Sequence, residues 1–167
     1  MNKEIKWYAV HTRPRWEKKV AGILHKKSIE FYCPLNKILR QWADRKKFVF
    51  EPLFTGYVFI RSTEEEHLKV KQTAGVINIV YWLGKPAVVK DAEIDAIKKF
   101  LDNYNNVQVQ KTQININDKV RIIHGPLIYL EGHVMNIMKH SIKILLPSLG
   151  FAMIAQLEYS SVEKMPN

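Results

Sequence analysis

Cysteine is almost absent from this sequence, and its scarcity excludes two kinds of architecture. Cys33 is the single cysteine in 167 residues, so the chain forms no internal disulfide and offers no pair of thiolates to zinc. It stands in the apolar run from Ile29 to Pro34, which predicts a buried structural thiol. This cysteine usage is typical of a protein in a reducing cytoplasm.

Long hydrophobic runs are also missing. No stretch approaches the roughly 20 apolar residues of a membrane-spanning helix. The first ten residues, MNKEIKWYAV, lack the apolar core of a signal peptide. We therefore expect a cytoplasmic protein with no membrane partner. Hydrophobic residues make up 47 % and charged residues 25 % of the chain, a balance that argues against wholesale disorder.

Recognisable catalytic chemistry is the third absence. None of the six histidines lies in a zinc-binding spacing, and no phosphate-binding glycine loop or nucleophilic serine motif occurs. The acidic residues cluster at 64–66 and 91–95, where they suit helix N-termini. We expect no catalytic residue, no cofactor and no metal ligand. The enzymatic alternative is a nuclease whose scattered carboxylates converge on a metal only after folding.

Positive charge, in contrast, is in excess and unevenly spread. The chain has 26 basic and 16 acidic side chains, a net charge of +10, and residues 1–50 alone hold 13 basic and 4 acidic ones. A concentrated positive field attracts polyanions. The charge therefore favours nucleic acid, or a complex containing it, as partner. The alternative is a solvated basic surface.

The order of patterns predicts an α+β domain at 1–104, a linker at 105–116 and an all-β module at 117–167. In the first domain we expect a strand at 6–12 and a helix from Trp16 to Lys27 with Pro14 in its first turn. Capping-box spacings at Ser62 and Thr63 predict a short helix, and Asp91 is expected to cap another. Further strands are predicted at 30–33, 36–42, 47–51, 55–61, 76–81 and 85–89.

The C-terminal module shows no helical period. Five short strands are predicted at 119–123, 131–138, 142–146, 151–156 and 162–164, with turns at Gly125–Pro126, Gly132 and Ser148–Gly150. Five short strands in so few residues favour a small barrel.

The segment EPLFTGYVFI, residues 51–60, carries the most functional information. Alternate side chains of a strand share a face, so Tyr57 and Phe59 point one way while Val58 and Ile60 point the other. The aliphatic face suits a core, and the aromatic face carries residues enriched in protein interfaces. The residues alone leave an alternative open, in which both rings pack under a helix.

Four segments of this chain resemble the NusG/Spt5 family of transcription elongation factors in order and spacing. WYAVHTRPRWEKKV, EPLFTGYVFI and TAGVINIV are similar to its N-terminal domain, and Asp118–Val134, ending in EGHV, is similar to its C-terminal KOW motif. The segments YCPLNKILRQWADRK and VYWLGKPAVV resemble most the specialised UpxY-type antiterminators, and the related RfaH branch shares the EPLF segment. The resemblance implies an antiparallel sheet flanked by helices, followed by an SH3-like KOW barrel.

The resemblance also implies a non-enzymatic function in transcription elongation and antitermination. The family's N-terminal domain binds the clamp helices of RNA polymerase through a hydrophobic depression. Tyr57 and Phe59 stand where relatives present clamp-contacting aromatic rings, Tyr8 matches a family aromatic, and His11 stands where the RfaH branch has another ring. His67 to Val70 match the region that approaches the polymerase gate loop, with His67 as the leading candidate.

Specialised relatives also contact non-template DNA in the transcription bubble. The matching positions here are Arg13, Trp16, Lys19 and Lys26. Positions 16, 19, 23 and 26 also form one helical stripe by spacing alone, which Ile23 interrupts with an apolar side chain. Cations there would contact phosphates, and Trp16 would stack on a base. The alternative is a solvated basic helix face.

In the KOW segment, Gly125 and Gly132 are the expected turn glycines. The resemblance implies a second partner for this barrel, either Rho or a small-subunit ribosomal protein. The rival interpretation of the whole chain is a ribosome-associated KOW protein that binds RNA, for which the EPLFTGYVFI segment would have no purpose.

Overall fold

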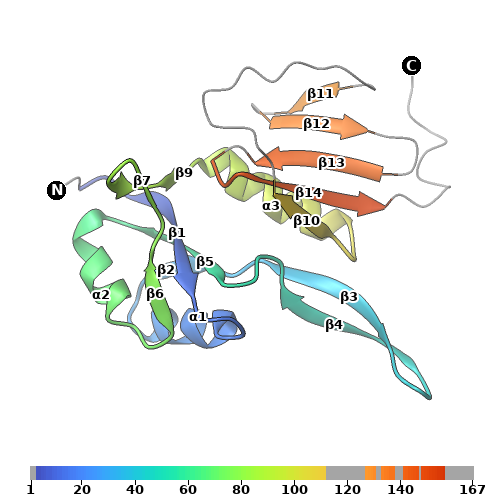
Figure 1. Cartoon of the computed structure of the whole chain (residues 1–167), viewed down its shortest axis with the longest axis horizontal. Helices are drawn as coiled ribbons and strands as arrows, with labels where there is room; N and C mark the ends of the chain where they lie inside the picture. The colour runs from blue at the N-terminus through green and yellow to red at the C-terminus, as the bar shows by residue number, and fades with distance from the viewer. Residues whose placement is uncertain (1–2, 112–126, 131–132, 138–140, 147, 157–167) are drawn as a thin grey trace. The chain divides into compact units, whose positions relative to one another are not determined.

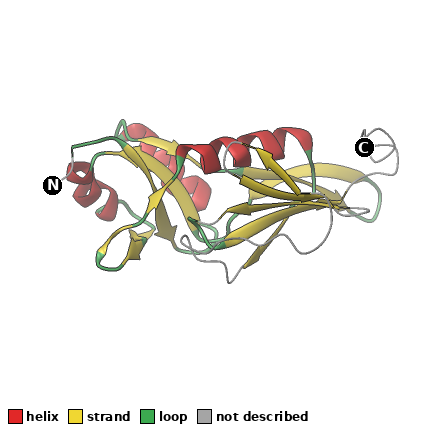
Figure 2. Ribbon diagram, turned by 90° about the horizontal axis from the view of Figure 1, so that it is seen from above, coloured by secondary structure: helices red, strands yellow, loops and turns green. Residues whose placement is uncertain are grey.

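The computed structural model describes residues 3–111, 127–130, 133–137, 141–146 and 148–156 (Figure 1). The chain divides into two compact units, Met1–Leu35 with Pro52–Ile94, and Asn36–Glu51 with Asp95–Asn167. The domain boundaries predicted at 104 and 117 stay a prediction. Figures 1 and 2 show the elements of each unit from two directions.

An antiparallel sheet organises the first unit. Its strands lie in the order β2-β5-β1-β6, and β9 also pairs with β1. The bounds are β1 Lys6–Thr12, β2 Glu30–Tyr32, β5 Tyr57–Ser62, β6 Val76–Ile79 and β9 Val88–Val89. The register pairs His11 with Tyr57 and Ala9 with Phe59. A separate small hairpin joins β7 (Tyr81–Trp82) to β8 (Lys85–Pro86).

Short helices cover one face of this sheet. These are α1 (Glu17–Lys26), the 3-10 turn η1 (Glu64–Glu66) and α2 (His67–Lys71). Val20 and Leu24 of α1 and Val70 of α2 pack with residues of the sheet in one buried cluster, which also contains Tyr8, Val10, Ile29, Val58, Ile60 and Ile79. Val58 and Ile60 therefore point into the core, as the alternation in their strand predicts.

The helices begin differently from the predictions. Pro14 precedes α1 rather than lying in its first turn, because the helix starts at Glu17 with Trp16 as N-cap. Thr63 caps η1 without a side-chain hydrogen bond, so neither predicted capping box forms there. Asp91 is the first residue of α3 (Asp91–Asn103) instead of its cap, and the backbone carbonyl of Lys90 accepts the first bonds.

The chain leaves and re-enters the first unit at one point. The backbone N–H of Leu53 donates to the carbonyl of Pro34 at 2.8 Å. Between these two residues runs a two-stranded ribbon, β3 (Leu35–Gln41) and β4 (Lys46–Pro52), which Figure 1 shows as a long hairpin. Most of this ribbon, residues 36–51, belongs to the second unit.

The rest of the second unit contains an antiparallel five-stranded sheet, in the order β10-β14-β13-β12-β11. Its strands are β10 Gln108–Lys111, β11 Leu127–Leu130, β12 His133–Ile137, β13 Ser141–Leu146 and β14 Phe151–Gln156. The predicted strands at 119–123 and 162–164 lie outside the described residues. Within the expected linker, residues 108–111 form a strand because β14 offers them a partner.

Among the described residues, no helix combines the length and the apolar character that a membrane crossing requires.

Candidate functional site

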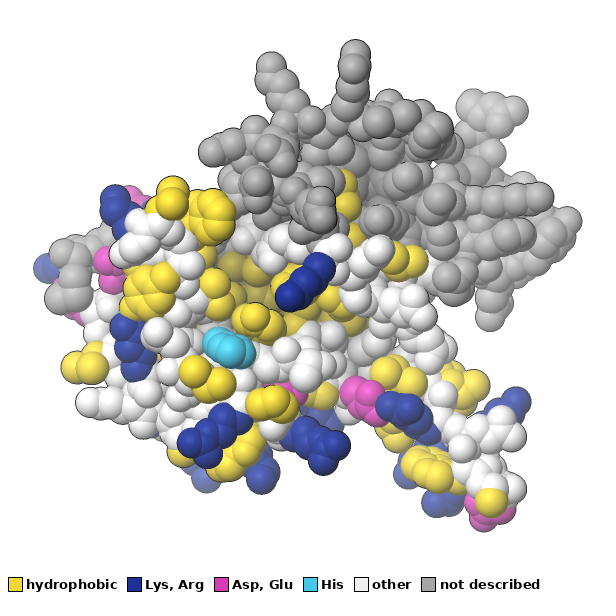
Figure 3. Space-filling model, in the orientation of Figure 1, with side chains coloured by type: hydrophobic (Ala, Val, Ile, Leu, Met, Phe, Trp, Pro, Cys, Tyr) yellow, Lys and Arg dark blue, Asp and Glu magenta, His cyan; other side chains and the backbone are white. Residues whose placement is uncertain are grey.

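The face of the first sheet opposite the helices carries a group of aromatic side chains. Here His11 of β1 is paired with Tyr57 of β5, and their rings stack with centroids 5.1 Å apart and planes 23° apart. Both side chains are half-buried. In the view of Figure 3, hydrophobic side chains gather over the strands of the first unit. We call His11, Tyr32, Phe54, Tyr57 and Phe59 the aromatic face.

Phe59 forms the buried floor of this face, with only 1 % of its surface exposed. Phe54 packs edge-on against it at 5.7 Å between ring centroids, and Tyr32 stacks on it at 6.4 Å. Tyr57 and Phe59 therefore share a face, as predicted, but differ in access to a partner. Tyr57 and His11 offer the accessible surface, and Phe59 supports it from below.

Tyr32 and Phe54 were not predicted as members of this group. The signal for Tyr32 is its place directly opposite Phe59 in the pairing of β2 with β5. Phe54 lies in the loop before β5, where no periodicity applies, so only the folded structure shows that its ring turns towards Phe59.

Tyr8 and His67 differ from the half-buried predicted polymerase contacts in being buried. Both lie in the interior, with 0 % and 5 % of their surface exposed, and their rings meet edge-on at 4.4 Å. Tyr8 is on the helix-packed face of β1 because it alternates with Trp7 and Ala9. A partner's surface cannot reach either ring without opening the core. The neighbouring Leu68, which is exposed, is the residue that α2 offers instead.

The buried His67 should make the first unit sensitive to acid. Burial lowers its pKa from the ordinary 6.5, with Lys71 lowering it further and Glu64 opposing both. The Nε2 atom has no hydrogen-bond partner. Because the unfolded chain then binds more protons than the folded one, the stability from neutral His67 is complete above pH 6.5 and is lost as pH falls through the lowered pKa.

We therefore expect His67→Phe, which keeps a ring against Tyr8 but cannot titrate, to flatten this acid-side loss of stability. The measurement is the unfolding free energy of both proteins at a series of pH values from neutral downward. Parallel curves for the variant and the unmodified protein would show that His67 is not the responsible group.

The predicted DNA-contacting residues run along α1, from Arg13 just before the helix to Lys26 at its last position. Arg13, Lys19 and Lys26 are exposed. Trp16 is half-buried and packs against the core cluster. Its ring is covered by the Lys19 ammonium, 4.8 Å from the centroid. A base can therefore stack on Trp16 only where this lysine side chain moves away, which it can do towards a phosphate.

Gly75 lies directly against Trp16. A Cβ atom placed on Gly75 would come within 2.6 Å of Trp16 Cε3 and 2.9 Å of Val20 Cγ2. The carbonyl of Gly75 also accepts a hydrogen bond from the backbone N–H of Arg13 at 2.9 Å. Gly75 thus holds both the ring of Trp16 and the backbone at Arg13 in place.

The remaining predictions concern turns, metals and nucleophiles. Gly125 and Gly132 lie outside the described residues. Within the part of the chain that the structure describes, no three His, Cys, Asp or Glu side chains gather as a metal site would require. Burial raises the pKa of the Cys33 thiol to about 11. At neutral pH this thiol is protonated, which is the unreactive form.

Comparison with known proteins places these features in a family context. Residues 5–98 match the family model described as transcription termination factor NusG. The chain is 28 % identical to the transcription termination/antitermination protein NusG of Pseudomonas aeruginosa, over 96 % of this chain and 98 % of that protein. It is also 28 % identical to the protein of the same name from Streptococcus pyogenes, over 95 % and 96 %.

Among solved structures, the chain resembles one titled "Domain interaction in Thermotoga maritima NusG". The two are 21 % identical, with a TM-score of 0.54 over 94 % of this chain and 95 % of the other. At this identity the likeness concerns the fold alone.

Proposed function

Since this chain belongs to the NusG family of transcription termination factors, we propose that it is a transcription elongation and antitermination factor that binds the clamp helices of RNA polymerase. The observation that carries the proposal is the aromatic face, where stacked Tyr57 and His11 lie at the surface above buried Phe59. Aromatic rings with a rigid floor are the side chains that supply most of the binding energy in protein interfaces.

The proposed mechanism requires no bond chemistry. The aromatic face binds the clamp, and Leu68 on α2 replaces His67 as the candidate contact with the gate loop on the opposite jaw. A factor that binds both jaws stabilises the conformation in which both sites are the right distance apart. Clamp opening, and the paused states that depend on it, become less populated because the factor binds them more weakly.

The exposed cations around α1 support a contact with non-template DNA. Arg13, Lys19 and Lys26 are exposed and would meet phosphates, and a base would take the place of the ammonium over Trp16. This contact, together with the segments YCPLNKILRQWADRK and VYWLGKPAVV, is the basis for proposing a specialised member of the UpxY or RfaH type.

The C-terminal segment 117–167 is proposed as a KOW barrel that recruits a second partner, Rho or a small-subunit ribosomal protein. Its support is the antiparallel sheet formed by β11 to β14 together with β10. The proposed sites of this segment include the turn glycines Gly125 and Gly132.

The test is co-purification of the full chain with core RNA polymerase in the absence of nucleic acid. Replacing both Tyr57 and His11 with alanine should weaken binding about thirtyfold or more, the loss expected for an interface hot spot. Both side chains are half-buried, so the variant should stay folded. Undiminished binding by this folded variant, or sedimentation of the unmodified protein with ribosomal subunits instead of polymerase, would refute the proposal.

The matched control is Phe50→Ala, which removes an exposed ring from β4 in the other unit. It should bind core polymerase as the unmodified protein does. An equal loss in this control would mean that any exposed ring contributes and that the aromatic face has no special role.

A further inference from the structure

The β3–β4 ribbon carries large apolar side chains in unusually exposed positions. Trp42 at its turn is 46 % exposed and Phe50 on β4 is 54 % exposed, and Phe48 and Leu39 are exposed as well. A small hairpin that kept such rings for stability would bury them. Their exposure indicates a binding surface.

Basic side chains are interleaved with these rings. Lys37 Nζ lies 4.5 Å from the ring centroid of Phe48, and the guanidinium of Arg45 lies 5.8 Å from that of Trp42. Residues 36–51 contain five basic and two acidic side chains, and one of the acidic pair, Glu51, already binds Arg40 at 2.6 Å. Figure 3 shows the resulting mixture of hydrophobic and basic side chains along the ribbon.

Two of the rings and one of the cations share one face of the ribbon. Phe48 and Phe50 are two residues apart in β4, so they point to the same side, about 7 Å apart along the strand. Lys37 lies over Phe48 and therefore belongs to this side. Leu39, two residues from Lys37 in β3, follows it by alternation. One surface thus offers two successive flat rings with a cation beside them.

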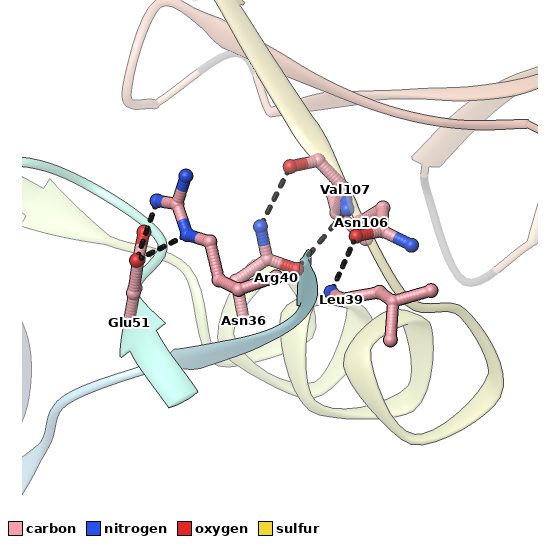
Figure 4. A network of polar contacts seen from close by, with 6 residues as sticks. All are labelled: Asn36, Leu39, Arg40, Glu51, Asn106 and Val107. Carbon is pink, nitrogen blue, oxygen red and sulfur yellow. Dashed lines mark hydrogen bonds and ion pairs between the residues drawn. The ribbon is translucent and has the colours of Figure 1, made fainter. Parts of the chain in front are cut away.

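The base of the ribbon is held firmly while its outer part stays exposed. The buried Asn36 side chain donates to the carbonyl of Val107 at 2.7 Å and accepts from its N–H at 3.0 Å (Figure 4). Asn106 repeats this pattern, because its side chain accepts from the N–H of Leu39 and its N–H donates to the carbonyl of Lys37. The ribbon is therefore anchored to residues of its own unit, which preorganises its surface for binding.

We propose that this face of the β3–β4 ribbon, together with the turn that carries Trp42, binds single-stranded nucleic acid. Bases would stack on Trp42, Phe48 and Phe50, and the cations that now cover two of these rings would move to the phosphates. Duplex nucleic acid fits less well because its bases are already stacked on one another. A protein partner also fits less well, since the centres of protein interfaces are depleted of lysine.

This site shares no residue with the aromatic face or with the α1 surface, so its test does not depend on either of them. The first measurement is fluorescence anisotropy of the full chain with labelled oligonucleotides of about 15 nucleotides, a length within the range of known single-strand sites. The probes are oligo-dT for single-stranded DNA, oligo-U for single-stranded RNA and a mixed-sequence duplex for double-stranded nucleic acid. Tighter binding to either single strand than to the duplex supports the proposal, and equal or tighter binding to the duplex overturns it.

The decisive variant replaces Trp42, Phe48 and Phe50 with leucine. It keeps every charge and an apolar surface and removes only the stacking rings. Its affinity for the single strand should fall about tenfold or more, since each stacked base contributes substantially. Unchanged affinity at every salt concentration overturns the proposal. Because the replaced rings are exposed, the circular dichroism spectrum should match that of the unmodified protein.

Two controls separate this site from the others. The Tyr57 and His11 double variant should bind the single strand normally. Replacing Arg13, Lys19 and Lys26 with alanine should leave ring-dependent binding in place, and its complete loss in this variant would assign the nucleic-acid site to α1 instead. Ultraviolet crosslinking of the unmodified protein, mapped by mass spectrometry, should label the peptide containing Trp42, and labels confined to α1 would contradict the ribbon site.

Discussion

Replacing Gly75 with alanine is expected to destabilise the first unit by about 3 kcal/mol. Gly75 adopts φ +89°, which an L side chain rarely tolerates, and its new Cβ would lie 2.6 Å from Trp16 Cε3. The backbone cost and the steric overlap therefore add. Trp16 cannot retreat, because it packs against the core cluster. Hydrogen exchange at the backbone amides of β1 and β5 measures the stability of this unit by itself.

Substitutions at two other glycines separate the backbone cost from the cost of steric overlap. Gly84 has φ +78°, but a Cβ atom added there would meet nothing within 4 Å, so Gly84→Ala should show the backbone cost alone, about 1–2 kcal/mol. Gly22 lies inside α1 with open space around it, and Gly22→Ala should stabilise by up to about 1 kcal/mol. A Gly75 effect no larger than that of Gly84 would mean that Trp16 and Val20 adjust freely.

Replacing Phe59 with alanine should destabilise the first unit by about 3–5 kcal/mol, the usual cost of removing a buried phenylalanine side chain. The ring is 1 % exposed and is in contact with Phe54 and Tyr32. A cavity would open beneath the aromatic face, and Tyr57 and His11 would lose their support. Loss of polymerase binding in this variant would therefore not identify a contact residue.

The half-buried Tyr57 serves as the comparison for Phe59. Tyr57→Ala removes an aromatic ring from the same strand but should cost clearly less stability, because much of its surface already contacts solvent. Urea unfolding monitored by circular dichroism compares the two variants. Equal destabilisation would show that the two rings are equally embedded, contrary to the description of Phe59 as the floor.

The arrangement of the aromatic face was largely predictable, because side-chain direction in a strand follows from the backbone alone. Alternation places Tyr57 and Phe59 opposite Val58 and Ile60, and the structure confirms this division. The strand at 6–12 was equally legible from its aromatic and β-branched residues, and the helix predicted from Trp16 to Lys27 from its apolar period, although it runs from Glu17 to Lys26. These features depend only on neighbours in sequence.

Whether a side chain on a given face is buried depends on residues far away in the sequence, so the sequence alone does not predict the burial of Phe59 or His67. Phe59 is buried by rings from a loop and from β2, and His67 is buried in a helix of only five residues, too short for a hydrophobic period. Residues distant in sequence also decide that β10 is a strand, because its own residues, QVQK with one valine, carry little apolar signal. Only its pairing with β14, more than 40 residues later, makes it a strand.

The hydrogen bond between Leu53 and Pro34 has a consequence for how this protein can diverge. Because the ribbon starts and finishes at adjoining points, its length and composition can change while the sheet that carries Tyr57 keeps its register. Gene duplicates could thus acquire new nucleic-acid preferences by remodelling one hairpin. The surface that carries Tyr57 and His11 would meanwhile be inherited unaltered.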